Sequence, residues 1–355
     1  MVTPYYDHAG IQIFLGDCRE VLQSLPAESV QTCVTSPPYW GLRNYGTATW
    51  GGGHEGCDHV ERTNKHGGTS NRPGLEAQTY KYRDTCGKCG ARRIDAQLGL
   101  EPTPEEYVAN MVEVFREVRR VLRDDGTLWL NLGDSYAASN PCDRRNIVGN
   151  GSPDEKMQRK SRLVGGLKNK DLVGIPWRVA FALQADGWWL RQDIIWHKPN
   201  PMPESVTDRC TKAHEYIFLL SKSAKYFWDA EAIAEPAAYA GQDRGGSTNR
   251  YAQNAAGMDN RQYARRNKRS VWTVNPQPFP GAHFATFPPK LIEPCIKAGA
   301  KPGDTVLDPF TGAGTTAVVA QSLGCHFVGA ELNDEYIDLA AKRLGQEVFA
   351  FEEAI

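Results

Sequence analysis

The feature that most constrains the fold is a strand, turn and helix pattern near the carboxyl end of the chain. Residues 305–307 predict a short buried strand, residues 308–314 hold two glycines in a turn, and residues 317–320 continue as an apolar, helix-like run. Glycine lets the backbone approach a ligand closely, and ligands of open α/β sheets bind at the carboxyl ends of the strands. We therefore expect an α/β sheet with a nucleotide-type cofactor pocket at this turn.

This turn differs from two common nucleotide-binding patterns. It lacks the three-glycine spacing of dinucleotide-binding proteins, and it has no lysine of the kind found in phosphate-binding loops. The next apolar run, residues 326–330, ends in Glu331, where an acidic side chain accepts hydrogen bonds from ribose hydroxyls. We expect the backbone at Gly312 and Gly314 to approach the cofactor, and Glu331 to bind its ribose.

A second motif, Ser36-Pro37-Pro38-Tyr39, follows an apolar run that predicts another buried strand. Two consecutive prolines have a fixed φ and donate no backbone N–H, so the strand must end there in a stiff loop. The Ser36 oxygen and the Pro37 carbonyl are suited to accept hydrogen bonds from the amino group of cytosine or adenine. Tyr39 is suited to stack on a base that has left the duplex. A lone motif of this kind is more often an ordinary turn, so the prediction depends on both motifs.

The two motifs together resemble those of the β-class DNA amino-methyltransferases, which transfer a methyl group from S-adenosylmethionine to cytosine N4 or adenine N6. In that family the Ser/Asp-Pro-Pro-Tyr motif precedes the Asp-Pro-Phe-x-Gly-x-Gly-Thr motif, the circularly permuted order found here. The resemblance implies an α/β class I S-adenosylmethionine-dependent methyltransferase fold. This fold is Rossmann-like, with a mostly parallel seven-stranded sheet, helices on both faces and an antiparallel edge hairpin, which we assign to residues 216–221 and 226–228.

The resemblance also implies roles for individual residues. Those expected to be catalytic are Ser36, Pro37, Pro38 and Tyr39. Those expected to bind the cofactor are Asp17, Asp308, Pro309, Phe310, Gly312, Gly314, Thr315, Glu331 and Lys290. For Asp17, a helix N-cap is an equal alternative. Serine at the first motif position is commoner in cytosine-N4 enzymes and aspartate in adenine-N6 enzymes, so we favour cytosine N4 and keep adenine N6 as the alternative.

Other strand ends add candidates to the ligand side of the sheet. Asp134 follows the predicted strand at residues 127–132 and is a candidate pocket residue. His197 and Lys198 follow a tryptophan-rich strand and are candidates for the base pocket, although such a strand is more often part of a core.

Residues 41–93 form a polar, glycine-rich insert that contains two pairs of metal-binding residue types. Cys57 and His59 form the first pair, and Cys86 and Cys89 form the second within a tight Cys-x-x-Cys turn. Nine cysteines without a secretory signal predict thiols or metal ligands, and two close pairs in a loop too polar to fold by burial predict a structural Zn²⁺. Incidental thiols are the alternative, and His54 competes as the fourth ligand.

The net charge of −1 is unusual for a protein that binds DNA, because phosphates must be neutralised by cations. Two local runs are nevertheless basic. Residues 141–170 hold eight Lys and Arg against three acids, and residues 241–270 hold seven against two. We assign DNA contacts to Arg144, Arg145, Arg265 and Arg266, with solvated or disordered loops as the alternative.

These observations divide the chain into regions. Residues 1–40 and 94–231 form the catalytic half, 41–93 the zinc-binding insert, 232–275 a target-recognition region, and 276–355 the cofactor-binding half. Double-stranded DNA is the expected partner, and a homodimer stays open. No long apolar run or signal-like start is present, so we expect no membrane association and a cytoplasmic, bacterial or phage-type location.

Two alternatives from other classes and one closer alternative stay open. A nicotinamide oxidoreductase accounts for the glycine turn and Glu331 but leaves Ser36 and Tyr39 without a role. A non-catalytic, zinc-dependent nucleic-acid-binding protein accounts for the cysteines and the basic runs. Methyltransferases of RNA or of protein amides have related motifs, but they usually begin the first motif with Asn and place the cofactor motif earlier in the chain.

Overall fold

Five adjacent parallel strands form the centre of the sheet. The computed structural model describes residues 3–41, 47–57, 59, 85–86, 88–95, 97–137, 166–237, 264–277 and 287–352. The five strands are, in spatial order, β2 (Ile11–Leu15), β13 (His326–Glu331), β12 (Thr305–Asp308), β3 (Val30–Thr35) and β6 (Leu122–Leu132). Every residue of β3 is buried, as is typical of a parallel strand covered on both faces.

The remaining strands extend this sheet to nine. β8 (His214–Ser221) lies antiparallel between β6 and β7 (Trp189–His197), and three-residue strands close the two edges, β1 (Tyr6–His8) and β11 (Val271–Thr273). The mostly parallel sheet of the predicted class is therefore present, with β1 and β11 added to the seven larger strands. Two small sheets lie apart from it, β4 (Thr49–Gly51) with β5 (Arg92–Ile94) and β9 (Glu235–Pro236) with β10 (Arg265–Arg266).

The antiparallel hairpin was predicted with the wrong partner. β8 pairs with β6 along one edge and with β7 along the other, so it has no free edge for residues 226–228, which lie outside any strand. The Phe227 N–H donates to the Asp125 carbonyl at 2.9 Å instead, and Trp228 stacks on Trp129 with ring centroids 5.7 Å apart. Residues 226–228 therefore pack against the sheet and are not one of its strands.

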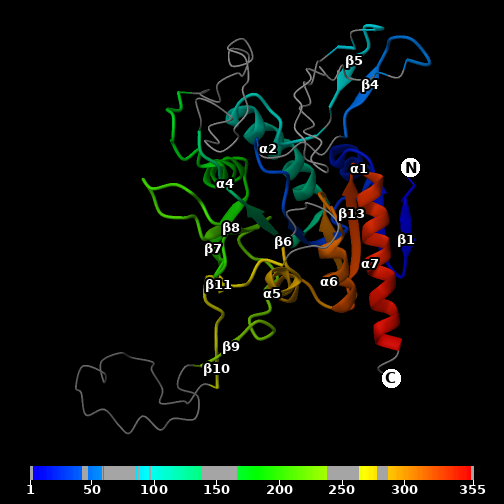
Figure 1. The fold of residues 1–355 in the computed structure, drawn as a ribbon. Helices are drawn as coiled ribbons and strands as arrows, with labels where there is room; N and C mark the ends of the chain where they lie inside the picture. The colour runs from blue at the N-terminus through cyan, green and yellow to red at the C-terminus, as the bar shows by residue number, and fades with distance from the viewer. Residues whose placement is uncertain are drawn as a thin grey trace, which may run out of the picture.

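In the part of the chain that the structure describes, three helices cover each face of the sheet (Figure 1). One layer holds α1 (Cys18–Ser24), α2 (Pro104–Val121) and α4 (Ile175–Ala185). The other holds α5 (Pro289–Gly299), α6 (Thr315–Ser322) and α7 (Asp334–Glu352). Within α2 the buried residues Tyr107, Met111, Val114 and Val118 recur at helical spacing, which places one apolar stripe against the sheet.

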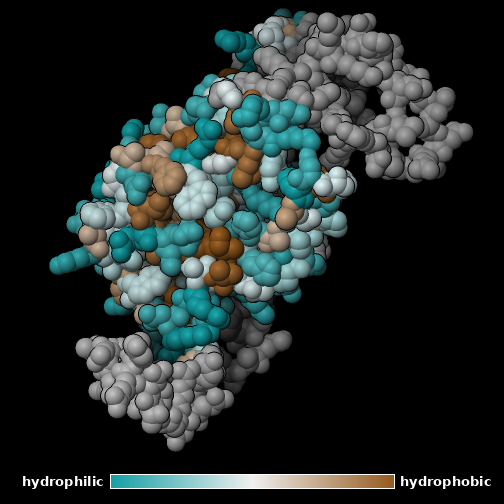
Figure 2. Space-filling model, turned by 90° about the vertical axis from the view of Figure 1, so that its left-hand side faces the viewer, coloured by the Kyte–Doolittle hydropathy of each residue, from teal (hydrophilic) through white to brown (hydrophobic). Residues whose placement is uncertain are grey.

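The surface on the side of α4 and β7 mixes hydrophobic and hydrophilic residues (Figure 2). Phe181 and Trp189 are among its exposed large side chains. None of the helices in the described part of the chain is both long and apolar enough to span a membrane.

The carboxylate of Asp308 joins the two sequence motifs. β12 pairs directly with β3, so Asp308 at the end of one strand lies beside Thr35 at the end of the other. The carboxylate accepts hydrogen bonds from Thr35 Oγ1 at 2.6 Å, Thr316 Oγ1 at 2.7 Å and the Phe310 N–H at 3.0 Å. Asp308 is 2% exposed, and its burial raises the pKa of the carboxyl to about 6.

We predict that Asp308→Ala lowers the free energy of unfolding by about 2–4 kcal/mol, because it leaves the Thr35 hydroxyl and the Phe310 N–H without their acceptor and removes the nearer of the two acceptors of the Thr316 hydroxyl. Asp308→Asn should cost less, since the amide oxygen still accepts a hydrogen bond. Urea denaturation followed by circular dichroism measures both. A loss below about 0.5 kcal/mol for Asp308→Ala would contradict this role.

The raised pKa also predicts a pH dependence. The folded carboxyl binds its proton more tightly than the unfolded one, so its contribution is complete below the unfolded pKa of about 4 and is lost as the pH rises through about 6. Relative to Asp308→Asn, the wild-type unfolding free energy should fall by about 2 kcal/mol between pH 4.5 and 7.5. Glu113→Gln, an exposed change on α2, is the matched control, and parallel curves for wild type and Asp308→Asn would refute the prediction.

Candidate active site

A cleft opens at the carboxyl ends of β2, β3, β12 and β13. It contains about 830 Å³ of empty space, a volume that includes open solvent. Residues from both motifs line it, namely Ser36 and Pro38 from the first and Pro309, Phe310, Gly312 and Ala313 from the second. The structure therefore places the two motifs in one cavity.

Glu331 forms part of the cavity wall where β13 ends. One carboxylate oxygen accepts from the Gly312 N–H at 2.8 Å, and the other accepts from the N–H groups of Leu332 and Asn333, both at 2.9 Å. Burial raises the pKa of this carboxyl, while the three N–H donors act in the opposite direction. A carboxylate offers about four acceptor positions, so capacity remains for a hydroxyl of a bound ligand.

The predicted cofactor residues fall into two groups. Those that line the cavity are Asp17, Pro309, Phe310, Gly312 and Glu331. For Asp17 the helix N-cap alternative is confirmed, because its carboxylate caps α1 by accepting from the Arg19 N–H at 2.8 Å, and its contact with the cofactor stays a prediction. The second group lies outside the cavity lining and consists of Asp308, Gly314, Thr315 and Lys290.

Each member of the second group has another place in the fold. Asp308 lies beneath the turn and holds it to β3. Gly314 has a φ of +75°, and a Cβ there would lie 2.6 Å from the Cβ of Ala340 on α7. Thr315 Oγ1 accepts from Arg343 at 3.1 Å, and Lys290 is exposed in the first turn of α5.

The Ser36–Tyr39 loop is held by hydrogen bonds to the neighbouring strands. The Tyr39 hydroxyl lies 2.8 Å from the Glu215 carboxylate and 3.2 Å from Asn131 Oδ1, and Ser36 Oγ donates to the same Asn131 oxygen at 3.3 Å. Burial, followed by the charge of Glu215, raises the pKa of Tyr39 well above its usual value, so the hydroxyl stays protonated. Glu215 also forms an ion pair with Lys198.

Two close contacts fix the position of this loop. The Pro38 carbonyl accepts from the Tyr107 hydroxyl at 2.9 Å. The ring of Tyr39 lies against Gly133, where a Cβ would be 2.4 Å from the ring. Both contacts restrict Tyr39 to one orientation beside the cavity.

Two residues of this network, Asn131 and Glu215, were not predicted from the sequence. Asn131 is a polar residue inside an otherwise apolar strand, and this was a usable signal. Glu215 stands at the start of an apolar strand, where an acidic residue is ordinarily solvated, so no local pattern distinguished it. Asp134 does not line the cavity and instead caps α4, accepting from the N–H groups of Gly174 and Ile175 at 3.0 and 3.1 Å.

The four predicted metal ligands come together at one end of the β4–β5 sheet. The ligand atoms of Cys57, His59, Cys86 and Cys89 all lie within 4.8 Å of one another. His54 is outside this cluster, and its Nδ1 lies 3.5 Å from the Glu55 carbonyl.

The predicted DNA contacts are described only in part. Arg144 and Arg145 lie outside the described residues, as do residues 238–263 of the expected target-recognition region. Arg265 is exposed on β10 and donates to the Ala234 carbonyl at 2.8 Å, whereas Arg266 lies 3.6 Å from the carboxylate of Glu235.

Comparisons with known proteins agree with this architecture. The family model N6_N4_Mtase, described as DNA methylase, matches residues 30–342. The Type II methyltransferase M.Cfr9I of Citrobacter freundii is 44% identical over 343 residues, which cover 95% of this chain and 89% of that protein.

Solved structures show the same fold at low sequence identity. PvuII DNA methyltransferase (cytosine-N4-specific) has a TM-score of 0.58 and is 19% identical, covering 96% of this chain and 88% of that chain. The Thermus thermophilus protein TTHA0409, solved with S-adenosyl-L-methionine, has a TM-score of 0.52 and is 22% identical, covering 95% and 94%.

Gly312 and Gly314 have different surroundings, so an alanine should cost a different amount of stability at each position. Gly314→Ala adds a Cβ that clashes with Ala340 at a positive φ, so the free energy of unfolding should fall by about 2–4 kcal/mol. Gly312→Ala meets no atom closer than 3.9 Å and should cost only about 1 kcal/mol, from its φ of +51°. Urea denaturation of both variants provides the test, and equal losses would contradict it.

Proposed function

We propose, from the premise that this chain belongs to the DNA methylase family, that it transfers the methyl group of S-adenosylmethionine to cytosine N4 in double-stranded DNA. The observation that carries the proposal is the shared cavity: Ser36 and Pro38 line one part, and Phe310, Gly312 and Glu331 line the other. A methyl donor held by one motif would therefore meet an amino group held by the other at the short distance that group transfer requires.

The donor half suits a nucleoside with a ribose. Glu331 has acceptor capacity left for ribose hydroxyls, and Gly312 leaves the backbone open to the ligand because it has no side chain. S-Adenosylmethionine, when bound, supplies a methyl group on a cationic sulfur, which makes that methyl electrophilic. Asp17 and Phe310, which line the same cavity, complete the proposed donor site.

In the acceptor half, hydrogen bonds orient Ser36. The Asn131 amide donates from Nδ2 to the Tyr216 carbonyl at 3.0 Å, so its Oδ1 faces Ser36 and Tyr39 as an acceptor. The Ser36 O–H therefore points to Asn131, and its lone pairs are left to accept from the substrate. With the Pro37 carbonyl as second acceptor, the two amino hydrogens would be held and the nitrogen lone pair turned toward the methyl group.

This arrangement assigns most of the rate enhancement to positioning. A serine hydroxyl is too weak a base to remove an amino proton at neutral pH. The nitrogen would instead form its bond to the methyl carbon as the sulfur–methyl bond breaks and S-adenosylhomocysteine leaves, and the cationic nitrogen would then release one proton to the surrounding water. Tyr39, whose hydroxyl is held by Glu215 and Asn131, is proposed to stack on the flipped base.

Cytosine N4 is favoured because serine occupies the first motif position. The DNA contacts of Arg144, Arg145, Arg265 and Arg266, the target-recognition role of residues 232–275, the remaining region boundaries and a homodimeric state stay predictions that accompany this proposal.

The decisive experiment is transfer of labelled methyl from S-adenosylmethionine to mixed-sequence duplex DNA, followed by nucleoside analysis. N4-methylcytosine is expected, and Ser36→Ala should reduce the rate by about 10²-fold or more while donor binding persists. N6-methyladenine would overturn the choice of base and keep the transfer mechanism. Donor binding without transfer to any DNA base would overturn the proposal.

The contact between Tyr39 and Gly133 gives a second test. Gly133→Ala places a methyl group inside the space of the Tyr39 ring, so kcat should fall at least about tenfold as the loop shifts. The dissociation constant for S-adenosylmethionine, measured by calorimetry, should change less than about twofold because Tyr39 is not part of the donor half. Gly345→Ala on α7, where an added Cβ meets nothing within 4 Å, is the matched control and should keep wild-type kcat.

A further inference from the structure

The Cys57, His59, Cys86 and Cys89 cluster has the dimensions of a zinc site. Cys57 Sγ lies 3.9 Å from Cys86 Sγ, and Cys89 Sγ lies 3.5 Å from His59 Nδ1. A tetrahedral ion with Zn–S bonds of about 2.3 Å and a Zn–N bond of about 2.0 Å separates its sulfurs by about 3.8 Å and sulfur from nitrogen by about 3.5 Å. The side chains thus already surround the volume of one ion.

A disulfide or a harder cation fits the cluster less well. A disulfide needs two sulfurs about 2.05 Å apart, whereas these cysteines are free and the sulfurs of Cys57 and Cys86 are separated by 3.9 Å. Three thiolates and one imidazole are soft to borderline ligands, which favour zinc over magnesium or calcium. A complete set of four protein ligands is typical of a structural and not a catalytic zinc site.

The backbone around the ligands forms two tight turns. The Cys57 N–H donates to the His54 carbonyl at 3.1 Å, and the Gly90 N–H donates to the Cys86 carbonyl at 2.9 Å. Trp50 of β4 stacks on the His59 ring with centroids 5.3 Å apart, which orients the imidazole. Each pair of ligands is therefore presented by a defined local structure.

The described part of the insert has little else to hold it together. Within its described part and the described residues between β5 and α2, the buried hydrophobic residues are Cys86, Ala91 and Leu98. β4 and β5 have three residues each, and an isolated two-stranded sheet is at best marginally stable in water. A metal ion supplies the missing stability in small segments of this kind.

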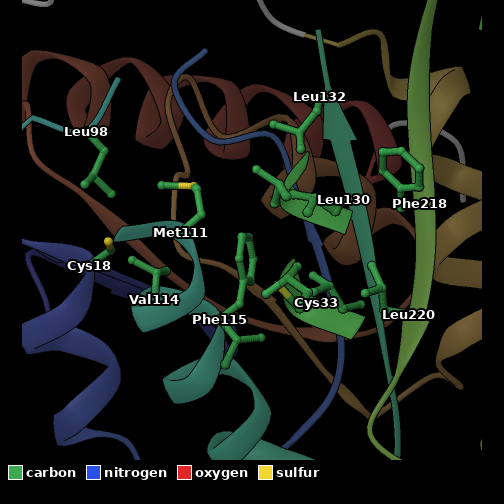
Figure 3. Close-up of a cluster of buried hydrophobic side chains, with 14 of the residues drawn as sticks. Cys18, Cys33, Leu98, Met111, Val114, Phe115, Leu130, Leu132, Phe218 and Leu220 are labelled. Atoms are coloured by element: carbon green, nitrogen blue, oxygen red, sulfur yellow. The ribbon is translucent and has the colours of Figure 1, made fainter. Parts of the chain in front are cut away.

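The hairpin leads directly into the wall of the cavity. Thr47 lies two residues before β4, Gln97 and Leu98 lie shortly after β5, and all three line the cavity. Leu98 belongs to the hydrophobic core beside Cys18 and Met111 (Figure 3). The Gly99 carbonyl then accepts from the Gly41 N–H at 2.7 Å, which connects this wall to the Ser36–Tyr39 loop.

We propose that Cys57, His59, Cys86 and Cys89 bind one structural Zn²⁺, and that this ion holds the β4–β5 hairpin so that Thr47, Gln97 and Leu98 close the methyl-donor cavity. The metal site follows from the ligand geometry alone. Its effect on donor binding rests on the proposed function.

Metal content of the purified full-length protein tests the first half. Plasma mass spectrometry should find about one zinc per chain, and cobalt exchanged into the site should give the visible bands of tetrahedral thiolate coordination. His59→Ala should lose most of the zinc, whereas His59→Cys, which keeps four ligands, should retain it. Cys210→Ser, a change of an exposed cysteine outside the cluster, is the matched control. Wild-type protein without zinc, or His59→Ala with a full equivalent, would overturn the site.

Donor binding tests the second half. Chelation of the wild-type metal and the His59→Ala change should each raise the S-adenosylmethionine dissociation constant about tenfold or more, and added Zn²⁺ should reverse the effect of chelation. Unchanged donor affinity in zinc-free, folded protein would refute the role in the cavity and leave the metal site in place. If zinc is bound but wild-type protein binds no S-adenosylmethionine at all, the proposed function fails and the role in the cavity fails with it.

Discussion

The structure depends on one buried carboxylate, that of Asp308. A charge removed from water is costly unless several donors compensate it, so the fold is stable only when the donors of Asp308 are in place. These donors come from the end of β3, from the turn after β12 and from α6. Satisfying Asp308 therefore sets the position of the donor-site turn relative to the loop that begins at Ser36. Asp308 thus aligns the two halves of the site through these hydrogen bonds, although it does not itself line the cavity.

The loop of the first motif receives its orientation from β6 and β8, the two strands that follow β3 in the sheet. Pro37 and Pro38 make the loop stiff, but they do not determine the direction in which the Ser36 hydroxyl or the Tyr39 ring points. Asn131 and Glu215 determine that direction, because Asn131 accepts from the Ser36 hydroxyl and Glu215, on the antiparallel strand β8, accepts from the Tyr39 hydroxyl. The antiparallel strand thus contributes a polar residue that holds Tyr39 beside the cavity, although Glu215 itself does not line the cavity.

The part of the cavity wall that flanks the insert is supported differently from the rest of the site. Most of the site is supported by the sheet and by helices packed on two apolar cores. Thr47, Gln97 and Leu98 instead flank a two-stranded sheet with few buried residues, and Leu98 alone of the three enters the main core. A metal ion is a physically reasonable support there, since coordination bonds need no large apolar surface. The wall and the catalytic loop meet at Gly41 and Gly99.

The sequence by itself determined the features that depend on local pattern. Paired prolines, a glycine turn between a strand and a helix, and two closely spaced ligand pairs have physical consequences within a few residues, so the motifs, the fold class and the four clustered Cys and His residues were predictable. Only the tertiary structure decided which residues of a motif reach the cavity and which support it. Gly312 and Gly314 look alike in sequence, but one faces the cavity and the other faces Ala340 of α7. The partner of β8, the caps made by Asp134, and the roles of Asn131 and Glu215 were likewise decided by pairing between distant segments, because hydrogen bonds and steric contacts across a sheet depend on strand order and not on local sequence.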